Sequence, residues 1–233
     1  MLITEMNWMQ VEDFLRRDDR CILPTGSTEQ HAYLSLSVDT ILASRLAAEV
    51  GELAAVPVYP ALPYGLATQW TAFPGTVTLR INTYLALIRD VLDSIRRAGF
   101  RRILLINGHG GNAPAQGMLR EWMMDNPDSC VKWHNWYNAP KTWAKVLQTD
   151  PVCSHASWME NYPWTRLAGL ALPEGAKPLT DLDKLTRLNP QQTRELLGDG
   201  NMGGLYQRSD EEMLAIWQVA VAETCALLEK DWD

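Results

Sequence analysis

The sequence predicts a single-domain α/β protein, spanning residues 1–233, in which a mostly parallel sheet is flanked by helices. Through the first 135 residues, short apolar runs alternate with segments whose apolar residues recur at helical spacing. Residues 103–106 form a continuous apolar run, as expected for a strand that helices cover on both faces. A chain of 233 residues with 46% hydrophobic residues is long enough for one domain with a full core.

Each expected element has its own local signal. Pro24 and Gly26 stop the first apolar run, Asp39 and Asn82 are residues that can cap helices, and Ser209 with Glu212 forms a capping box. Beyond residue 150 the pattern thins into a proline-containing, loop-rich span. The expected elements are, in order, strand 21–23, helix 39–53, strand 55–59, helix 82–99, strand 103–106, a helix that Asn112 and Pro114 start and that runs to about 123, strand 131–133, and helix 209–228.

Composition narrows the range of partners. The net charge is -7 and no basic block occurs, so a nucleic-acid partner has little electrostatic support. No run of roughly 18 apolar residues predicts a membrane span, and the acidic amino terminus argues against a secretory signal. The four cysteines are widely spaced, which is typical of reduced thiols. We therefore expect a cytoplasmic protein that acts on a small molecule, without nucleic-acid or membrane partners.

Three short stretches hold most of the side chains that could bind a metal. The chain has only four histidines, and three of them lie in these stretches together with three carboxylates. The first two stretches each follow the carboxyl end of an expected parallel strand, where ligands bind in open α/β sheets. The residues concerned are Glu29, His31 and Asp39 in the first stretch, His109 in the second, and His155 and Glu160 in the third.

The second stretch is a glycine-rich turn around His109. Its glycines allow a tight turn and a close approach of the backbone to a ligand, and the helix expected next directs its amino end to the same place. The turn could hold a phosphate, but it has neither the lysine of a P-loop nor the spacing of a dinucleotide fingerprint. The histidine in its middle favours a metal.

Together these stretches resemble the creatininase (creatinine amidohydrolase) family. The resemblance is carried by Gly-Ser-Thr-Glu-Gln-His at 26–31, Asp39, Phe-Pro-Gly-Thr at 73–76, Asn-Gly-His-Gly-Gly-Asn at 107–112, and His155 with Glu160. It spans about residues 20–225 in the family's order. It implies a single-domain α/β fold, a homo-oligomer (with a hexamer as one form), and a centre of two divalent ions, zinc, manganese or iron. Such a centre hydrolyses amide bonds in small, often cyclic, substrates.

Carried over to this sequence, the resemblance implies a role for each residue. Glu29 and His109 would be terminal ligands of one metal, Asp39 the bridging carboxylate, and His31 and Glu160 ligands of the other. Two divalent ions can lower the pKa of a shared water and polarise a substrate carbonyl. His155 would be a catalytic residue that either transfers a proton or orients the substrate, and Glu160 belongs to the catalytic centre as a ligand.

The sequence also departs from the family pattern. The stretch after His31 lacks a second histidine and is one residue shorter, and Gly111 stands where creatininase has a glutamate. Glu160 would therefore supply the missing carboxylate, and creatinine is disfavoured as the substrate. Trp70 replaces a histidine that is common before the FPGT stretch. The run from Tyr33 to residue 36 is similar to the 3-dehydro-scyllo-inosose hydrolase branch of the family.

Tryptophans near the motifs suggest aromatic walls for the substrate pocket. Trp70, Trp133 and Trp158 are the candidates, although large aromatic residues occur more often in cores and interfaces. Plainer interpretations also exist for the other residues: a histidine and a carboxylate two residues apart are often a surface pair, and Asp39 could cap its helix as well as bind metal. We interpret His134 and Cys153 as structural.

The leading hypothesis is a dinuclear metal-dependent hydrolase that cleaves a C–N bond of a small cyclic or formyl amide. A close alternative is metal-dependent ring-opening of a cyclic ketone such as an oxidised inositol. An alternative of another class is a non-catalytic protein that holds an anionic metabolite at the glycine turn and the following helix.

Overall fold

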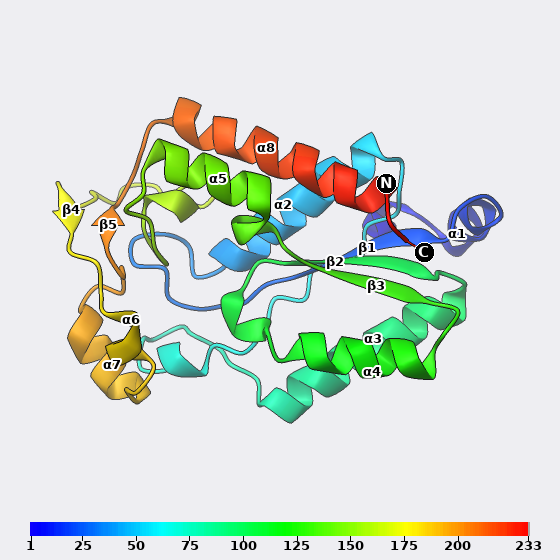
Figure 1. Cartoon of the computed structure of the whole chain (residues 1–233), viewed down its shortest axis with the longest axis horizontal. Coiled ribbons are helices and arrows are strands. Elements are labelled where there is room, and N and C mark those ends of the chain that lie inside the picture. The colour runs from blue at the N-terminus through cyan, green and yellow to red at the C-terminus, as the bar shows by residue number, and fades with distance from the viewer. Residues whose placement is uncertain (233) are drawn as a thin grey trace.

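A three-stranded parallel sheet forms the centre of the protein in a computed structural model that describes residues 1–232. Its strands are β1 (Arg20–Thr25), β2 (Arg102–Asn107) and β3 (Cys130–Asn135), and they lie side by side in that order (Figure 1). Nearly every residue of β1 and β2 is buried, as expected for strands covered on both faces. The predicted α/β fold with a parallel sheet is confirmed.

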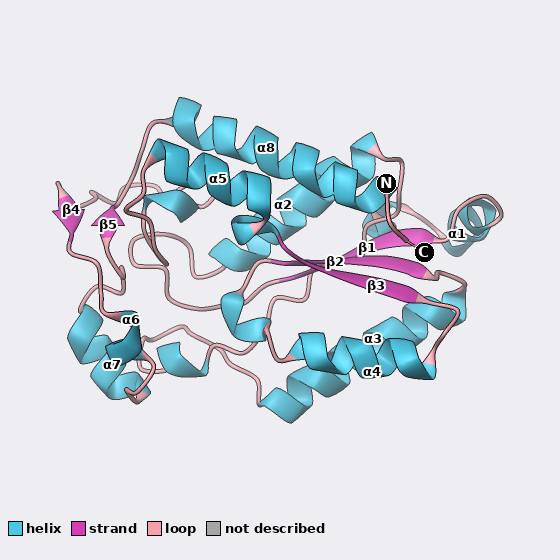
Figure 2. Ribbon diagram, viewed as in Figure 1, coloured by secondary structure: helices cyan, strands magenta, loops and turns pink. Residues whose placement is uncertain are grey.

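Helices cover both faces of the sheet. One face packs against α2 (Val38–Leu53), α5 (Pro140–Thr149) and α8 (Asp210–Glu229), and the other against α3 (Ile81–Ala98) and α4 (Ala115–Asp125), as Figure 2 shows. Successive side chains of a strand point to opposite faces, and the two hydrophobic clusters divide accordingly. The first contains Ile22, Leu104 and Ile106, and the second contains Cys21, Leu23, Ile103 and Leu105.

The second half of the chain is rich in loops, as the sequence indicates. It adds α6 (Leu182–Leu185), α7 (Pro190–Leu197) and a two-stranded antiparallel pair, β4 (Ala176–Lys177) with β5 (Gly204–Leu205). These elements lie at the end of the molecule opposite α1 (Trp8–Leu15) in Figure 1. Short 3-10 helices occupy Ile3–Glu5, Thr68–Trp70, Gly110–Asn112, Trp136–Asn138 and Trp158–Glu160.

Several local expectations need correction. Residues 55–59 do not form a regular strand; Val58 makes only single bridges, to Leu2 and Ile22, because Pro57 has no N–H to continue a ladder. Asn82 is not the cap of α3, which begins at Ile81. The capping box of Ser209 and Glu212 is confirmed at the start of α8. None of the helices within residues 1–232 is long and apolar enough to cross a membrane.

Candidate metal centre

The loops after β1 and β2 bring the first two motifs together. The loop after β1 carries Glu29 and His31, and the loop after β2 carries His109. The two loops meet near the start of α2, and the approach is so close that a Cβ at Gly108 would lie 2.3 Å from the backbone oxygen of Asp39. Only glycine fits at this position without displacing α2. The parallel sheet thus places residues that are 80 positions apart in the sequence at one edge.

Asp39 lies in the first turn of α2 and occupies the centre of the cluster. Its Oδ1 lies 3.2 Å from Nε2 of His31, and its Oδ2 lies 2.9 Å from Nδ1 of His109. The two oxygens of one carboxylate thus face two different histidines. The expectation that Asp39 also caps its helix is wrong, because Ser37 holds the N-cap position and Asp39 is already helical.

Two further carboxylates complete the cluster. Oε1 of Glu29 lies 3.3 Å from Nδ1 of His109, and Oε2 of Glu160 lies 3.8 Å from Nε2 of His31. Candidate ligand atoms lie within 4.8 Å of one another in the group Glu29, Asp39 and His109, and likewise in the group His31, Asp39 and Glu160. The structure therefore brings together all five residues for which the resemblance implies metal ligation, in two groups that share Asp39.

Backbone carbonyls set the direction of both histidines. Nδ1 of His31 donates to the backbone oxygen of Glu29 at 3.1 Å, and Nε2 of His109 donates to the backbone oxygen of Leu66 at 3.1 Å. A neutral histidine that donates from one ring nitrogen presents a lone pair on the other, which is how metal-binding histidines are held. Nε2 of His31 and Oε2 of Glu29 are buried and make no hydrogen bond among the described residues, although Nε2 of His31 lies 3.2 Å from the carboxylate of Asp39. Such orphaned atoms are rare in protein interiors.

The charges within the cluster are strongly coupled. Burial would lower the pKa of His31, but the carboxylates of Asp39 and Glu160 outweigh it and raise the pKa of His31 to about 10. Burial would raise the pKa of Asp39, yet His31 and His109 hold that pKa well below its usual range. Burial raises the pKa of Glu160 to about 7. The protein therefore favours positive charge between these carboxylates, and a divalent cation would supply it.

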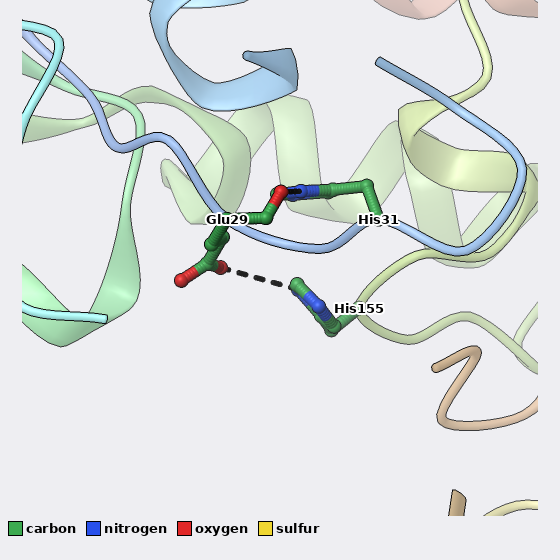
Figure 3. A group of neighbouring side chains, drawn as sticks. All are labelled: Glu29, His31 and His155. Atoms are coloured by element: carbon green, nitrogen blue, oxygen red, sulfur yellow. Dashed lines mark hydrogen bonds and ion pairs between the residues drawn. The ribbon is translucent and has the colours of Figure 1, made fainter. Parts of the chain in front are cut away.

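His155 lies beside this cluster and belongs to a segment far from the other motifs in the sequence. Figure 3 shows Glu29 and His31 on one loop, with His155 approaching from a separate segment. Nδ1 of His155 lies 3.8 Å from Oε1 of Glu29, and the three residues form a third group with metal-binding spacing. The ring stacks on Trp70, with ring centres 4.4 Å apart and planes 18° apart.

A cavity of about 600 Å³ opens over the cluster. Trp70, Tyr137 and Trp143 contribute aromatic walls, and His109, His155, Glu29, Asp39 and Glu160 are among the polar residues that line it. None of the described residues that line this cavity is lysine or arginine. This site cavity is large enough for a small molecule and presents to it four of the five candidate metal ligands, all but His31.

Only one of the three predicted substrate-binding tryptophans lies in the site cavity. Trp70 lines it. Trp158 is 0% exposed and donates from Nε1 to the backbone oxygen of Val152 at 2.8 Å, so it is a core residue. Trp133 lines a different cavity, next to β3, and donates to Asn135 at 2.8 Å. The structure places Trp133 and Trp158 outside the site cavity, because neighbouring positions on a strand or loop point in different directions, and it therefore gives no support to substrate contacts by these two residues.

The structure adds residues that the sequence analysis did not single out. Ser27 donates from Oγ to Oδ2 of Asp39 at 2.7 Å, and Gln30 contacts His155. Both lie within the first motif, so the motif itself was the available signal. Tyr137 and Trp143 line the site cavity from the segment after β3. Trp143 belongs to α5, whose helical spacing the sequence analysis overlooked.

Two residues of the glycine turn have structural roles, of which only that of Asn112 differs from expectation. Asn112 does not cap α4, which begins at Ala115; it accepts from the backbone N–H of Leu66 and donates to the backbone oxygen of Gly26. A Cβ at Gly111 would lie 2.2 Å from the backbone oxygen of Leu66 and 2.4 Å from Nε2 of His109. A glutamate at this position would not fit the present backbone, which is consistent with the carboxylate coming from Glu160.

The fold and the site together define an α/β protein with a candidate metal centre at the edge of a parallel sheet. The chain belongs to the creatininase family, because the family model described as creatinine amidohydrolase matches residues 4–228. The fold agrees closely with a crystal structure of creatinine amidohydrolase, with a TM-score of 0.80 at 22% identity over 99% of this chain and 97% of that one. Creatininase structures described as a Zn-Zn type and as an Mn form also match, with TM-scores of 0.76 and 0.78 at 22% and 21% identity, over 99% of this chain and 98% of each.

Curated relatives within the family have different activities. Creatinine amidohydrolase of Pseudomonas putida is 31% identical over 48% of this chain and 46% of its own. The 3-dehydro-scyllo-inosose hydrolase of Thermotoga maritima is 31% identical over 45% of this chain and 34% of its own. A mycofactocin precursor peptide peptidase of Mycolicibacterium smegmatis is 36% identical over 40% of each chain. The chain thus spans less than half the length of the curated relatives it matches, and family membership supports a hydrolase without fixing the substrate.

Proposed function

We propose that the protein is a hydrolase that uses two divalent metal ions to cleave a C–N bond in a small, neutral cyclic or formyl amide. One observation carries the proposal: the carboxylate of Asp39 directs its two oxygens to two separate groups of buried ligand-type atoms. A shared carboxylate between two such groups is typical of two-metal hydrolytic sites.

The residues present fit two divalent cations. Glu29, Asp39 and the two histidines are almost completely enclosed, and the side chain of Glu160 is 17% exposed. Such a group of carboxylates would be costly without a compensating positive charge. Oε2 of Glu29 and Nε2 of His31 are directed into the cluster without hydrogen-bond partners among the described residues. Zinc and manganese, which the matched creatininase structures contain by description, and also iron, accept this mixture of imidazole and carboxylate ligands.

Each side chain then has a definite task. Glu29, Asp39 and His109 would hold one ion, and His31, Asp39 and Glu160 the other. When bound, the two ions supply activation of a water and polarisation of the substrate carbonyl. His155 faces the site cavity at the edge of the cluster, where its imidazole can move a proton to the leaving nitrogen or hydrogen-bond the substrate.

The walls of the site cavity support a flat or ring-shaped neutral substrate. Trp70, Tyr137 and Trp143 offer aromatic faces, on which a heterocycle or the apolar face of a sugar-like ring can stack. The described lining contains no lysine or arginine to pair with a carboxylate of the substrate. This disfavours recognition of an anionic peptide terminus.

A second candidate function is hydrolytic ring-opening of a cyclic ketone. The similarity to the inosose hydrolase of Thermotoga maritima, at the same percentage identity as creatinine amidohydrolase, favours this candidate. The same activated water and the same stacking walls would serve it. We further propose, from the family resemblance and the composition, that the chain works in the cytoplasm as a homo-oligomer.

Metal content per chain, measured by elemental mass spectrometry on protein purified without chelator, tests the proposal first. About two equivalents of zinc, manganese or iron are expected, and removing them should abolish hydrolysis until metal is restored. A panel of cyclic amides, N-formyl amides and keto-inositols then separates the two candidate reactions. Absence of bound metal even after metal addition would overturn both and leave a non-catalytic metabolite-binding protein.

A further inference from the structure

Gln30 connects the candidate catalytic histidine to a distant glycine-rich segment. The residue lies between the two ligands of the first motif and is 4% exposed. Its side-chain amide lies 2.9 Å from Nε2 of His155 and 3.1 Å from the backbone oxygen of Gly200. Those partners are 125 and 170 residues away in the sequence, so this amide joins three separate parts of the fold.

Two backbone groups determine which way the amide of Gln30 points. The backbone N–H of Ala32 can only donate, and it donates to Oε1 of Gln30 at 3.0 Å. The backbone oxygen of Gly200 can only accept, and it accepts from Nε2 of Gln30 at 3.1 Å. The amide nitrogen is therefore the atom beside His155, and its second hydrogen is available to that ring.

This orientation determines the tautomer of His155. Nε2 of the ring accepts the amide hydrogen of Gln30 at 2.9 Å, so a neutral ring carries its hydrogen on Nδ1. Nδ1 is the nitrogen that lies 3.8 Å from Glu29, at the site cavity. The backbone oxygen of Gln30 lies 3.2 Å from the same Nε2 and would favour the opposite tautomer; the shorter contact, from an amide fixed at both ends, outweighs it.

The glycine-rich segment 198–204 packs against the side chain of Gln30 and hydrogen-bonds the backbone around His155. Gly200 has φ of +98°, and a Cβ there would lie 1.8 Å from Oε1 of Gln30. The segment also binds the backbone around His155: the N–H of Met202 donates to the oxygen of His155 at 3.1 Å, and Ser154 donates to the oxygen of Gly203 at 2.5 Å. The segment therefore leaves room for the side chain of Gln30 only while position 200 is glycine.

We propose that Gln30 is a positioning residue which, held by the backbone of Gly200, fixes the ring of His155 on Trp70 with its Nδ1 hydrogen directed into the site cavity. His155 then acts as a hydrogen-bond or proton donor from Nδ1, and it is not a metal ligand through that nitrogen. The tautomer of His155 follows from its contacts with Gln30 alone, and only the expected effect on kcat rests on the proposed hydrolase function.

Ring-nitrogen NMR of the zinc-loaded protein tests the proposal directly. The chain has four histidines, so comparison with His155→Gln identifies the signals of His155. We expect its hydrogen on Nδ1 in the natural protein and on Nε2 in Gln30→Glu, because the carboxylate of that variant can only accept. A natural protein with the hydrogen on Nε2, or an unchanged tautomer in Gln30→Glu, would overturn the proposal.

A pair of glycine variants tests the role of the distant segment. In Gly200→Ala the new methyl group would displace the amide of Gln30, whereas a methyl group in Gly198→Ala, also at a positive φ of +64°, meets nothing within 4 Å. The first variant should shift the signals of His155 as Gln30→Met does, and the second should not. If the signals of His155 shift equally in both glycine variants, or do not shift in Gln30→Met, then Gly200 does not hold Gln30 in place against His155.

Kinetics and metal content separate positioning from a general structural defect. Gln30→Met should keep the natural metal content and KM while kcat falls about 10- to 100-fold, the range found when a residue that orients a site group is removed. Gln30→Asn, which keeps an amide, should recover part of kcat. Loss of metal together with kcat would contradict the proposal. If the natural protein binds no metal, the NMR results still decide the inference while the hydrolase proposal fails separately.

Discussion

Two cavities in this protein contain a histidine and a tryptophan near the carboxyl end of a parallel strand. They differ in whether the buried polar atoms around them have hydrogen-bond partners. In the cluster beneath the site cavity, Nε2 of His31 and Oε2 of Glu29 are buried without hydrogen bonds among the described residues. In the β3 cavity, of about 480 Å³, His134 bonds Thr224 at 2.9 Å. Glu223 there accepts from the first backbone N–H groups of α5.

The charges of the two histidine environments differ in the same way. Carboxylates outweigh burial and raise the pKa of His31 to about 10, whereas burial lowers the pKa of His134 to about 4 with only Glu223 opposing it. A satisfied, neutral histidine is a packing residue. Unsatisfied ligand atoms among several carboxylates indicate a binding site, and cavity volume alone does not distinguish the two.

The largest expected effect follows from removing the carboxylate that both ligand groups share. Asp39→Asn keeps the size of the side chain but removes the charge, so at least one equivalent of metal should be lost. Because metal activation supplies several kcal/mol of transition-state stabilisation, kcat should fall roughly 1,000-fold or more. Elemental mass spectrometry and initial rates on the same samples measure both effects.

The matched control for that change is Glu223→Gln in the β3 cavity. This variant also neutralises a carboxylate beside a histidine, but it should keep both metals and the natural kcat, because Glu223 hydrogen-bonds the start of α5 and no residue of the cluster. Two tightly bound ions in Asp39→Asn would contradict the bridging role, and loss of metal in Glu223→Gln would show that the two cavities are not independent.

Removing one aromatic wall of the site cavity should raise KM about tenfold. Trp70→Ala removes the ring that lines the site cavity and stacks on His155 at 4.4 Å, so KM should rise about tenfold, the equivalent of one aromatic stacking contact. Trp133→Ala should leave KM within about twofold, because Trp133 lies in the β3 cavity. Steady-state kinetics on both variants measure this difference. An equal change of KM in the two variants would contradict the placement of Trp70, and not Trp133, at the substrate.

Local sequence signals predicted the scaffold of the site well. The apolar run at 103–106 became part of β2, and the residues that follow β1 and β2 do meet at one edge of the sheet. The pattern at 55–59 misled because Pro57 interrupts a strand of otherwise suitable composition. The helix α5 was missed even though Pro140 occupies its first turn and Trp143 and Val146 are helically spaced.

Contacts between distant segments could not be derived in the same way. Glu160 was assigned from the family resemblance, because no periodicity brings residue 160 beside residue 31; the structure places them 3.8 Å apart, and ligation itself stays a prediction. Trp158 and Trp70 look alike in the sequence, yet one is in the core and the other lines the site cavity. The contact between Gln30 and Gly200 depends on loop paths that carry no local signal.

The smallest effect on the site is expected from His134, whose titration should affect only stability. Burial lowers its pKa from 6.5 to about 4 in the folded protein, so between those values the unfolded chain binds more protons at this residue. The contribution of His134 to the free energy of unfolding is therefore complete above pH 6.5 and is lost as the pH falls toward 4. The loss should amount to on the order of 2 kcal/mol, after allowance for partial solvent access.

Urea unfolding of the natural protein and of His134→Asn and His134→Gln, repeated at several pH values from 7 to 4, measures this contribution. Other titrating groups are common to all three proteins, so the difference in pH dependence isolates His134 even if the lost bond to Thr224 lowers stability at every pH. Metal content and kcat at pH 7 should not change. A parallel pH dependence in all three proteins would mean that His134 is not held neutral, and a loss of metal would mean that the β3 cavity communicates with the metal centre.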